Sequence, residues 1–271
     1  MPRFDTGLLR ESLPDETAAC LDELEVFASI GSTNTHLLGK RPPAVGKFHA
    51  AITDDQRAGR GRQDKRWIAP PGAGLCLSCA WSFRERLSEL PSLTLALGVG
   101  VVDALAGLGI DGISLKWPND VVAADGKLGG ILTETRAGVG EGVMVVAGIG
   151  LNVALPGYVR LGLDSGWALA PVDLARVAPG CPPRERVAAE ILAGFHATAV
   201  AFAKEGFAGF ADAWRGRDWL RGRHIIVSDA EAEIHGVAAG VDDDGALLVT
   251  TGRGPTRVIT GSIRLAGDAA E

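Results

Sequence analysis

The pattern of apolar and polar positions along the chain predicts strands and helices that alternate. Short apolar runs bounded by glycine, proline or polar clusters are typical of β-strands. Such runs occupy residues 24–30, 45–53, 75–81, 113–116, 121–123, 127–134 and 143–153. Segments that are apolar throughout, or apolar at helical spacing, predict helices at residues 92–108, 184–204 and 207–215. We therefore expect an α/β (α+β) domain in which a mixed sheet is backed by helices.

The pattern changes at Gly222. From there short strands follow one another at turn-separated intervals, which is typical of a small all-β unit. An acidic run ending in Gly245 is interpreted as a hairpin turn, because no glutamate follows at the spacing of a calcium loop. The sequence thus predicts two domains, residues 1–221 and residues 222–271. Two segments are expected to lack long elements: residues 1–23, irregular or partly helical, and residues 155–183, a surface connection.

Composition narrows the class of protein. With 46% hydrophobic and 22% charged residues in a chain of 271, the protein is predicted to be globular and not disordered. The net charge of -6 argues against general nucleic-acid binding, so DNA is not an expected partner. A secretory signal is not expected, since Glu11, Asp15 and Glu16 interrupt the N-terminal segment. The apolar run at residues 93–108 is shorter than the ~20 residues of a membrane span, so we expect a cytoplasmic protein without a membrane partner.

Cys76 and Cys79 form a C-x-x-C pair within a predicted strand. Side chains three positions apart on a strand point to opposite faces, so the two thiols are not placed to share a metal or a disulfide. No second C-x-x-C follows in the sequence. Both cysteines are interpreted as buried structural thiols.

The strongest chemical signal is the segment from Gln56 to Trp67, which reads QRAGRGRQDKRW. Glycine lets the backbone turn tightly and approach a ligand, and arginine offers a planar, permanently charged fork for carboxylate or phosphate oxygens. The segment therefore predicts a loop that binds an anionic ligand carrying phosphates, with an exposed basic turn as the alternative. Its glycine content also predicts mobility without ligand. No physical role is assigned to Arg57.

Other polar residues follow predicted strands. Ser32 and Thr33 suit either a helix N-cap or a ligand contact, and Asn152 suits either a base edge or a turn contact. Lys116 and Asn119 lie at the end of another strand, which Pro118 is expected to terminate. Glycines inside the strands of residues 127–134 and 143–153 predict that another group approaches the backbone closely. The latter strand contains Gly-Ile-Gly, but neither a third glycine nor a following helix completes a dinucleotide fingerprint.

Taken together, these motifs resemble those of the biotin protein ligases, also called biotin–acetyl-CoA-carboxylase ligases. The resemblance covers residues 24 to 265. It depends on five motifs in the same order, and each alone is modest. They are Ser32-Thr33-Asn34, the Gln56–Trp67 segment, Lys116-Trp117-Pro118-Asn119-Asp120, Lys127-Leu128-Gly129-Gly130-Ile131-Leu132 and Gly148-Ile149-Gly150-Leu151-Asn152-Val153.

The resemblance implies a fold, a reaction and a set of site residues. It implies that the C-terminal unit is an SH3-like barrel and that the enzyme joins biotin to ATP with release of pyrophosphate. Biotin then passes from biotinyl-5′-AMP to a lysine of a carboxylase biotin carboxyl-carrier domain. The implied catalytic residues are Arg60 and Lys127. The implied biotin-binding residues are Ser32, Thr33, Asn34, Gln56, Gly59, Arg60, Gly61, Arg62, Lys127, Gly129, Gly148 and Gly150. The implied ATP-binding residues are Arg60, Arg62, Trp67, Lys116, Asn119 and Asn152.

The residue types suit this chemistry independently. A carboxylate that attacks a phosphate brings two anions together, and fixed cations offset their repulsion. Mg²⁺ is expected on the nucleotide phosphates, and no protein metal ligand is certain. Many relatives carry an N-terminal DNA-binding domain, for which this chain is too short, so a ligase without that domain is expected. The oligomeric state is left as a monomer or a homodimer.

Two alternatives stay open at this stage. A lipoate or octanoate ligase would share the fold, but Ser32, Thr33 and Gln56 suit a urea ring better. A non-catalytic biotin sensor would not require both Lys127 and Arg60 at the reacting groups.

Overall fold

The protein is described by a computed structural model that covers residues 4–63, 65–83, 90–137, 142–157, 169–228 and 233–266. Its larger sheet has seven strands in the order β1-β2-β3-β7-β6-β5-β4. The pairing of β1 with β2 is parallel, and the other pairs are antiparallel. The strands are β1 (Leu21–Phe27), β2 (Phe48–Thr53), β3 (Gly74–Phe83), β4 (Ile113–Lys116), β5 (Asp120–Ala123), β6 (Gly126–Ala137) and β7 (Val143–Asn152). The expected mixed sheet is confirmed.

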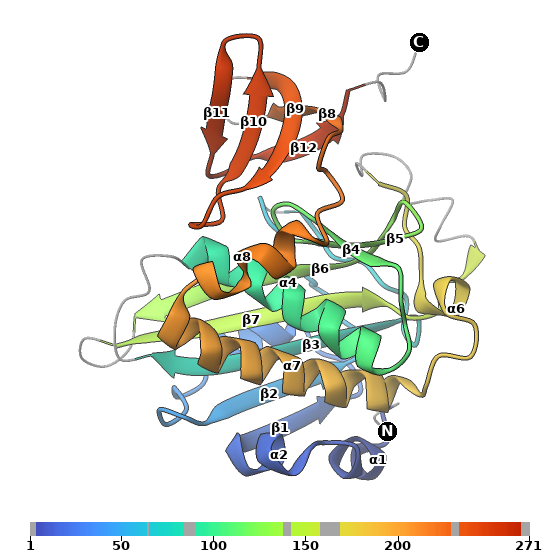
Figure 1. The fold of residues 1–271 in the computed structure, drawn as a ribbon. Coiled ribbons are helices and arrows are strands. Elements are labelled where there is room, and N and C mark those ends of the chain that lie inside the picture. The colour runs from blue at the N-terminus through green and yellow to red at the C-terminus, as the bar shows by residue number, and fades with distance from the viewer. Residues whose placement is uncertain are drawn as a thin grey trace.

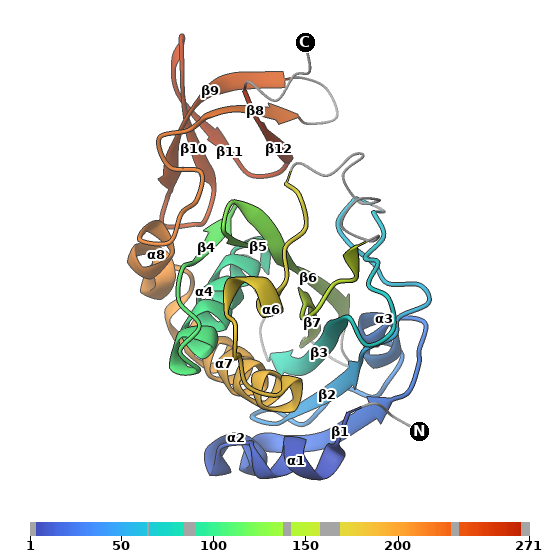
Figure 2. The ribbon, with the colours of Figure 1, turned by 90° about the vertical axis from the view of Figure 1, so that its right-hand side faces the viewer.

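Helices cover both faces of this sheet. Figure 2 shows α4 (Leu90–Gly107) and α7 (Arg184–Glu205) on one face and α3 (Thr33–Leu38) on the other. The helices α1 (Thr6–Glu11) and α2 (Asp15–Cys20) lie beside β1, and α8 (Ala208–Arg215) leads toward the second sheet. Among the described residues, the remaining helix is the short α6 (Leu174–Val177).

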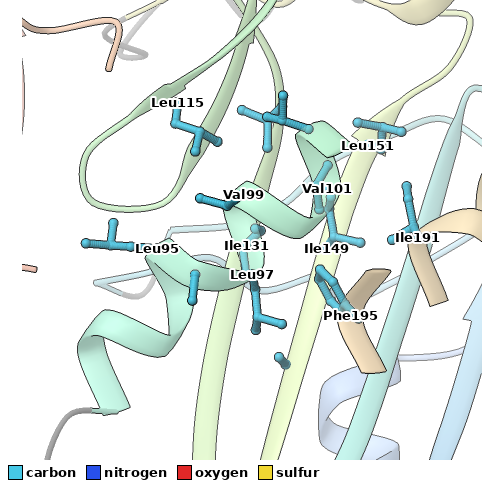
Figure 3. Close-up of a cluster of buried hydrophobic side chains, with 14 of the residues drawn as sticks. Leu95, Leu97, Val99, Val101, Leu115, Ile131, Ile149, Leu151, Ile191 and Phe195 are labelled. Atoms are coloured by element: carbon cyan, nitrogen blue, oxygen red, sulfur yellow. The ribbon is translucent and has the colours of Figure 1, made fainter. Parts of the chain in front are cut away.

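The main core lies between the sheet and the helices α4 and α7. In Figure 3, Leu97 and Val101 of α4, Ile191 and Phe195 of α7, and Ile149 of β7 point toward one another. All five are at most 2% exposed. Each such side chain contributes about 1.5–3 kcal/mol by leaving water, so this face of the sheet is committed to packing and cannot also bind a polar ligand.

By length and composition α7 is apolar enough to cross a membrane, and it is the one helix in the described part of the chain that is so. Half of its most apolar window is buried inside the protein. Its buried residues include Val187, Leu192 and Phe202. Packing within the core therefore accounts for the apolarity of this helix.

The second sheet is antiparallel and has five strands in the order β11-β10-β9-β8-β12. Its strands are β8 (His224–Ser228), β9 (Glu233–Val241), β10 (Leu247–Thr251), β11 (Gly254–Val258) and β12 (Ser262–Leu265), shown above the larger sheet in Figure 1. Bonds between it and the rest of the protein include one from the Trp117 indole to the Gly245 carbonyl (3.1 Å) and one from Arg215 Nε of α8 to the Val241 carbonyl (3.0 Å). The expected C-terminal β unit is thus present.

Several predicted boundaries differ from the structure. The first strand begins at Leu21 and not at residue 24, because α2 ends directly before it. The second strand begins at Phe48, after a turn in which the Lys47 N–H donates to the Ala44 carbonyl. The expected surface connection at residues 155–183 contains α6, and Leu174 at its start is fully buried. Parts of the predicted segments lie outside the described residues. They are residues 158–168 of that connection, Asp64 of the Gln56–Trp67 segment (called the arginine loop below), and residues 1–3, 229–232 and 267–271 of the predicted domains.

Candidate active site

A cavity of about 820 Å³ opens on the face of the sheet opposite α4 and α7. It is bounded by the start of α3, the Gln56–Trp67 segment, the β4–β5 turn, and strands β3, β6 and β7. The C-terminal sheet supplies a further wall. The residues of that wall are Ser228, Gly261, Ser262, Ile263 and Arg264. The cavity therefore lies where the two sheets meet, and side chains far apart in sequence line it.

Alternation along β3 explains why this face is available. Leu75, Leu77 and Cys79 point to the helical core, whereas Ser78 points to the cavity. Cys76 shares the Ser78 face, and burial raises the pKa of its thiol to about 12 against the opposing effects of Trp67 and Gln56. The two cysteines thus point to opposite faces and are free, as expected.

One end of the cavity is a hydrogen-bonded polar set. The side-chain oxygen of Gln56 accepts from the Thr33 N–H (2.8 Å) and from the Thr33 hydroxyl (3.1 Å). The Ser78 hydroxyl lies 2.6 Å from both Thr33 Oγ1 and Asn34 Oδ1. The Asn34 amide donates to the Leu132 carbonyl and to Glu134 Oε2. Because Thr33 and Asn34 are also buried, this network fixes their rotamers before any ligand arrives.

Ser32 has two roles in this structure. Its side chain accepts from the Thr35 N–H at 3.4 Å and so caps α3. It also lines the cavity. The sequence left capping and ligand contact as alternatives, and the geometry permits both.

The other end of the cavity is cationic. Lys127 Nζ lies 2.5 Å from Asp120 Oδ1, and Lys116 Nζ lies 3.6 Å from Asp120 Oδ2. Burial lowers the pKa of Lys116, and the Asp120 charge opposes this shift. Burial likewise lowers the pKa of Arg62. Two ammonium groups and one carboxylate together carry a net positive charge, which attracts an anion.

Charge is concentrated at this site. The described part of the lining contains seven basic side chains and one carboxylate, that of Asp120. The basic residues are Arg60, Arg62, Lys65, Arg66, Lys116, Lys127 and Arg264. The chain as a whole carries -6, so the cavity is a local positive region on a negative protein. Such a region favours a ligand with several negative charges.

Glycines make room for large groups at the cavity floor. A Cβ on Gly148 would lie 2.1 Å from Asn34 Oδ1, and one on Gly150 would lie 2.2 Å from Trp67 Cε2. A Cβ on Gly129 would lie 2.7 Å from the Gly150 carbonyl oxygen, and one on Gly59 would lie 2.4 Å from the Trp67 carbonyl oxygen. The expected close approach to the strand glycines is therefore observed. Gly59 and Gly129 act through backbone packing and are not among the residues that line the cavity.

Asn152 is placed differently from the other candidates. Its amide nitrogen donates to the carbonyls of Lys127 (3.2 Å) and Val172 (3.0 Å), and the residue is 4% exposed. It is not among the described residues that line the cavity. These bonds fit the turn-contact alternative and hold the β7 end in place, and the contact of Asn152 with the nucleotide stays a prediction.

Most sequence-predicted residues do meet in one cavity. They are Ser32, Thr33, Asn34, Gln56, Arg60, Gly61, Arg62, Trp67, Lys116, Asn119, Lys127, Gly148 and Gly150. Sequence reasoning missed Ser78, whose only signal is a polar residue at an alternate position of a buried strand. It also missed Glu134 and the lining residues of the C-terminal sheet, which no local pattern distinguishes.

Comparison with known proteins agrees with this geometry. Residues 26–152 match the biotin/lipoate A/B protein ligase family, and residues 221–263 match the biotin protein ligase C-terminal domain. The biotin–[acetyl-CoA-carboxylase] ligase of Mycobacterium tuberculosis is 32% identical over 96% of this chain and 94% of its own length. The bifunctional ligase/repressor BirA of Escherichia coli is 32% identical over 83% of this chain and 68% of its own length.

A solved structure supports the fold. The biotin protein ligase from Aquifex aeolicus in complex with biotin and ATP superposes with a TM-score of 0.73 at 24% identity, covering 91% of this chain and 99% of that one. The chain belongs to the biotin/lipoate A/B protein ligase family and, within it, to the biotin protein ligases. The family resemblance stated from the sequence is thereby confirmed.

Proposed function

We propose that the cavity binds biotin and ATP together, forms biotinyl-5′-AMP with release of pyrophosphate, and then transfers biotin to a lysine. The observation that carries this proposal is the union of two environments in one cavity. A preorganised set of amide and hydroxyl groups lies at one end, and a cluster of cations lies at the other. Arg60 and Lys127, on which the sequence argument depended, line this same cavity.

The polar end suits the ureido ring of biotin. A urea offers two N–H donors and one carbonyl acceptor, which amide and hydroxyl side chains can complement. Thr33, Gln56 and Ser78 are already ordered by their mutual bonds, so little side-chain entropy is lost on binding. We assign these residues, with Ser32 and Asn34, to the ring, and Gly148 to the space that the ring end requires.

The cationic end suits the reacting anions. In the first step a biotin carboxylate oxygen bonds to the α-phosphorus of ATP while the bond to pyrophosphate breaks. We assign Lys127 and Arg60 to the carboxylate and α-phosphate, and Arg62, Lys116 and Asn119 to the remaining phosphates. Preorganised charges of this kind lower the barrier because they are in place before charge develops. Alignment of the two reactants can lower the activation barrier by a further ~7–11 kcal/mol.

In the second step the amine of a carrier lysine attacks the acyl carbon and AMP leaves. We propose that the carrier is a biotin carboxyl-carrier domain of a carboxylase.

Trp67 lies over Gly150 beside the cavity floor, and we assign it to packing against the adenine. We further propose that the protein works in the cytoplasm, as a monomer or a homodimer, without DNA or a membrane as partner.

Magnesium is proposed to accompany the nucleotide. Mg²⁺ prefers oxygen ligands and usually retains several waters, so few protein ligands are required. The described lining offers few metal ligands, since Asp120 is its only carboxylate. The Asn119 amide nitrogen donates to the Ile131 carbonyl, which leaves its oxygen for a ligand. Both Asp120 oxygens already face ammonium groups, so Asn119 is the residue that would contact the ion, which would supply charge neutralisation at the phosphates.

The test is ATP–pyrophosphate exchange with biotin and, separately, with lipoate. Exchange that depends on biotin is expected, followed by labelling of a carrier domain at one lysine. Exchange with lipoate alone would overturn the substrate assignment and favour the other branch of the family. Binding of biotin without any exchange would favour a sensor.

A further inference from the structure

We infer that Glu134 is a positioning residue that latches the arginine loop onto the polar end of the cavity. The inference rests on the proposed function, because it concerns how that site retains its reactive adenylate. Glu134 belongs to β6, and its carboxylate has two partners from different parts of the site. Oε1 lies 2.9 Å from Arg60 Nη2, and Oε2 accepts from the Asn34 amide at 3.0 Å.

The geometry connects two groups that would otherwise be independent. Arg60 belongs to the glycine-rich loop, and its guanidinium also donates to the Thr35 hydroxyl at 3.4 Å. Asn34 belongs to α3 and contacts Ser78, which contacts Thr33. Glu134 therefore lies at the junction between the loop and the hydrogen-bond network that recognises the ring.

Exposure shows which partner is anchored. The Arg60 side chain is 48% exposed, whereas that of Glu134 is 19% exposed. Glu134 is fixed by its strand and by Asn34, so it acts as the immobile anchor and Arg60 as the mobile partner. The hydrogen bonds from the Gly61 N–H to the Lys65 carbonyl and from the Trp67 N–H to the Gly59 carbonyl fold the loop on itself. The contact with Glu134 adds a side-chain bond between this folded loop and the sheet.

The latch has a chemical consequence. The adenylate is a mixed anhydride, and it is lost by hydrolysis or leakage whenever the loop opens. A bond that closes the loop slows release. Because Glu134 also holds Arg60 and Asn34, which are assigned to the reacting groups and to the ring, its removal should raise the rate of adenylate escape by a larger factor than it lowers the rate of formation.

The first variant is Glu134→Gln, which keeps an acceptor for Asn34 and removes the charge that holds Arg60. Adenylate formed on the enzyme is separated from free ligands, and its release is followed over time. We expect release to be about two- to five-fold faster, which corresponds to about 1 kcal/mol or less for a partly exposed pair. Pyrophosphate exchange should fall by a smaller factor than the release rate rises. The matched control is Asp103→Asn on α4, which removes a carboxylate paired with Arg217. It should leave release unchanged.

A double-mutant cycle separates a latch from a general structural role. Biotinyl-5′-AMP is supplied directly in this cycle, because Arg60 is also assigned to adenylate formation. In an Arg60→Gln background, Glu134→Gln should have no further effect on release, because its partner is already absent. Equal release from wild type and Glu134→Gln would overturn the inference, and so would an undiminished effect in the Arg60→Gln background. If the wild-type protein shows no biotin-dependent exchange, the proposed function fails instead, so the two failures are distinguishable.

Discussion

The indole ring of Trp67 occupies the space beside the backbone of Gly150, where a Cβ would come within 2.2 Å of Cε2. Gly150 is on β7, and Trp67 ends the arginine loop, so the glycine decides how far that loop can settle onto the sheet. A side chain at this position would lift the ring that we assign to adenine.

We therefore expect Gly150→Ala to lower kcat/KM for ATP in pyrophosphate exchange by at least about tenfold, since a small displacement of a positioned group has large kinetic effects. Thermal unfolding should establish that the fold is retained. Gly107→Ala is the control, because a Cβ at that glycine meets nothing within 4 Å. In a Trp67→Phe background, Gly150→Ala should lower kcat/KM for ATP by a smaller factor than it does in the wild type. A normal KM for ATP in Gly150→Ala would contradict the assignment of Trp67.

Lys127 is expected to act in chemistry and not in stability. Lys127→Ala should lower pyrophosphate exchange by about 10²–10³, the usual effect of removing a preorganised charge from a transition state. The fold should persist because Asp120 keeps Lys116 as a partner. Lys204→Ala, at an exposed position of α7, is the control. Full exchange activity in Lys127→Ala would remove the role proposed for this lysine.

Thr33 tests the polar end separately from the cationic end. Thr33→Val keeps the shape but removes the hydroxyl that donates to Gln56 and lies near Ser78. We expect the KM for biotin to rise about tenfold, the cost of one or two lost hydrogen bonds, with little change in the KM for ATP. Thr94→Val removes a hydroxyl paired with Thr133 elsewhere in the fold and serves as control. A parallel rise in both KM values would indicate a general disturbance instead.

The buried carboxyl group of Asp218 should make the free energy of unfolding depend on pH. Burial raises its pKa from 3.8 to about 6, against the opposing effects of the Leu220 N–H and Arg221. Its Oδ2 is buried and has no hydrogen-bond partner among the residues described here. The folded protein thus holds a proton that the unfolded chain releases, so this contribution is full below pH 4 and is lost as the pH rises through about 6.

The expected loss is at most about 3 kcal/mol of the free energy of unfolding. It should be absent in Asp218→Asn, which cannot titrate. Urea unfolding at pH 4.5 and 7.5 measures the difference between wild type and variant, with Asp103→Asn as control. An identical pH dependence in wild type and Asp218→Asn would show that burial of this carboxyl does not shift its titration.

Local patterns in the sequence were sufficient for much of the fold. Short apolar runs identified the strands of the larger sheet, a long apolar run identified α4, and helical spacing identified α7. Boundaries were less certain where one element follows another directly, as α2 meets β1 at Leu21. No break in composition marks that junction, because the chain passes from helix to strand without a glycine or proline.

Local chemistry was also sufficient for the composition of the site. Glycine and arginine in one loop, and lysine after a strand, indicate an anion-binding site wherever they meet. The interpretation of Asn152 was less secure, because one amide suits a base edge and a backbone carbonyl equally well. The fold brings the Lys127 and Val172 carbonyls to the Asn152 amide nitrogen, a contact that no neighbouring residue in the sequence indicates.

By itself the sequence determined which elements form and which side chains carry charge, because both depend on residues close together in the chain. The tertiary structure alone decided that Glu134, Ser78 and Arg264 belong to the site. These residues reach it through strand alternation and through the docking of the second sheet, and long-range geometry of that kind leaves no periodic signal along the chain.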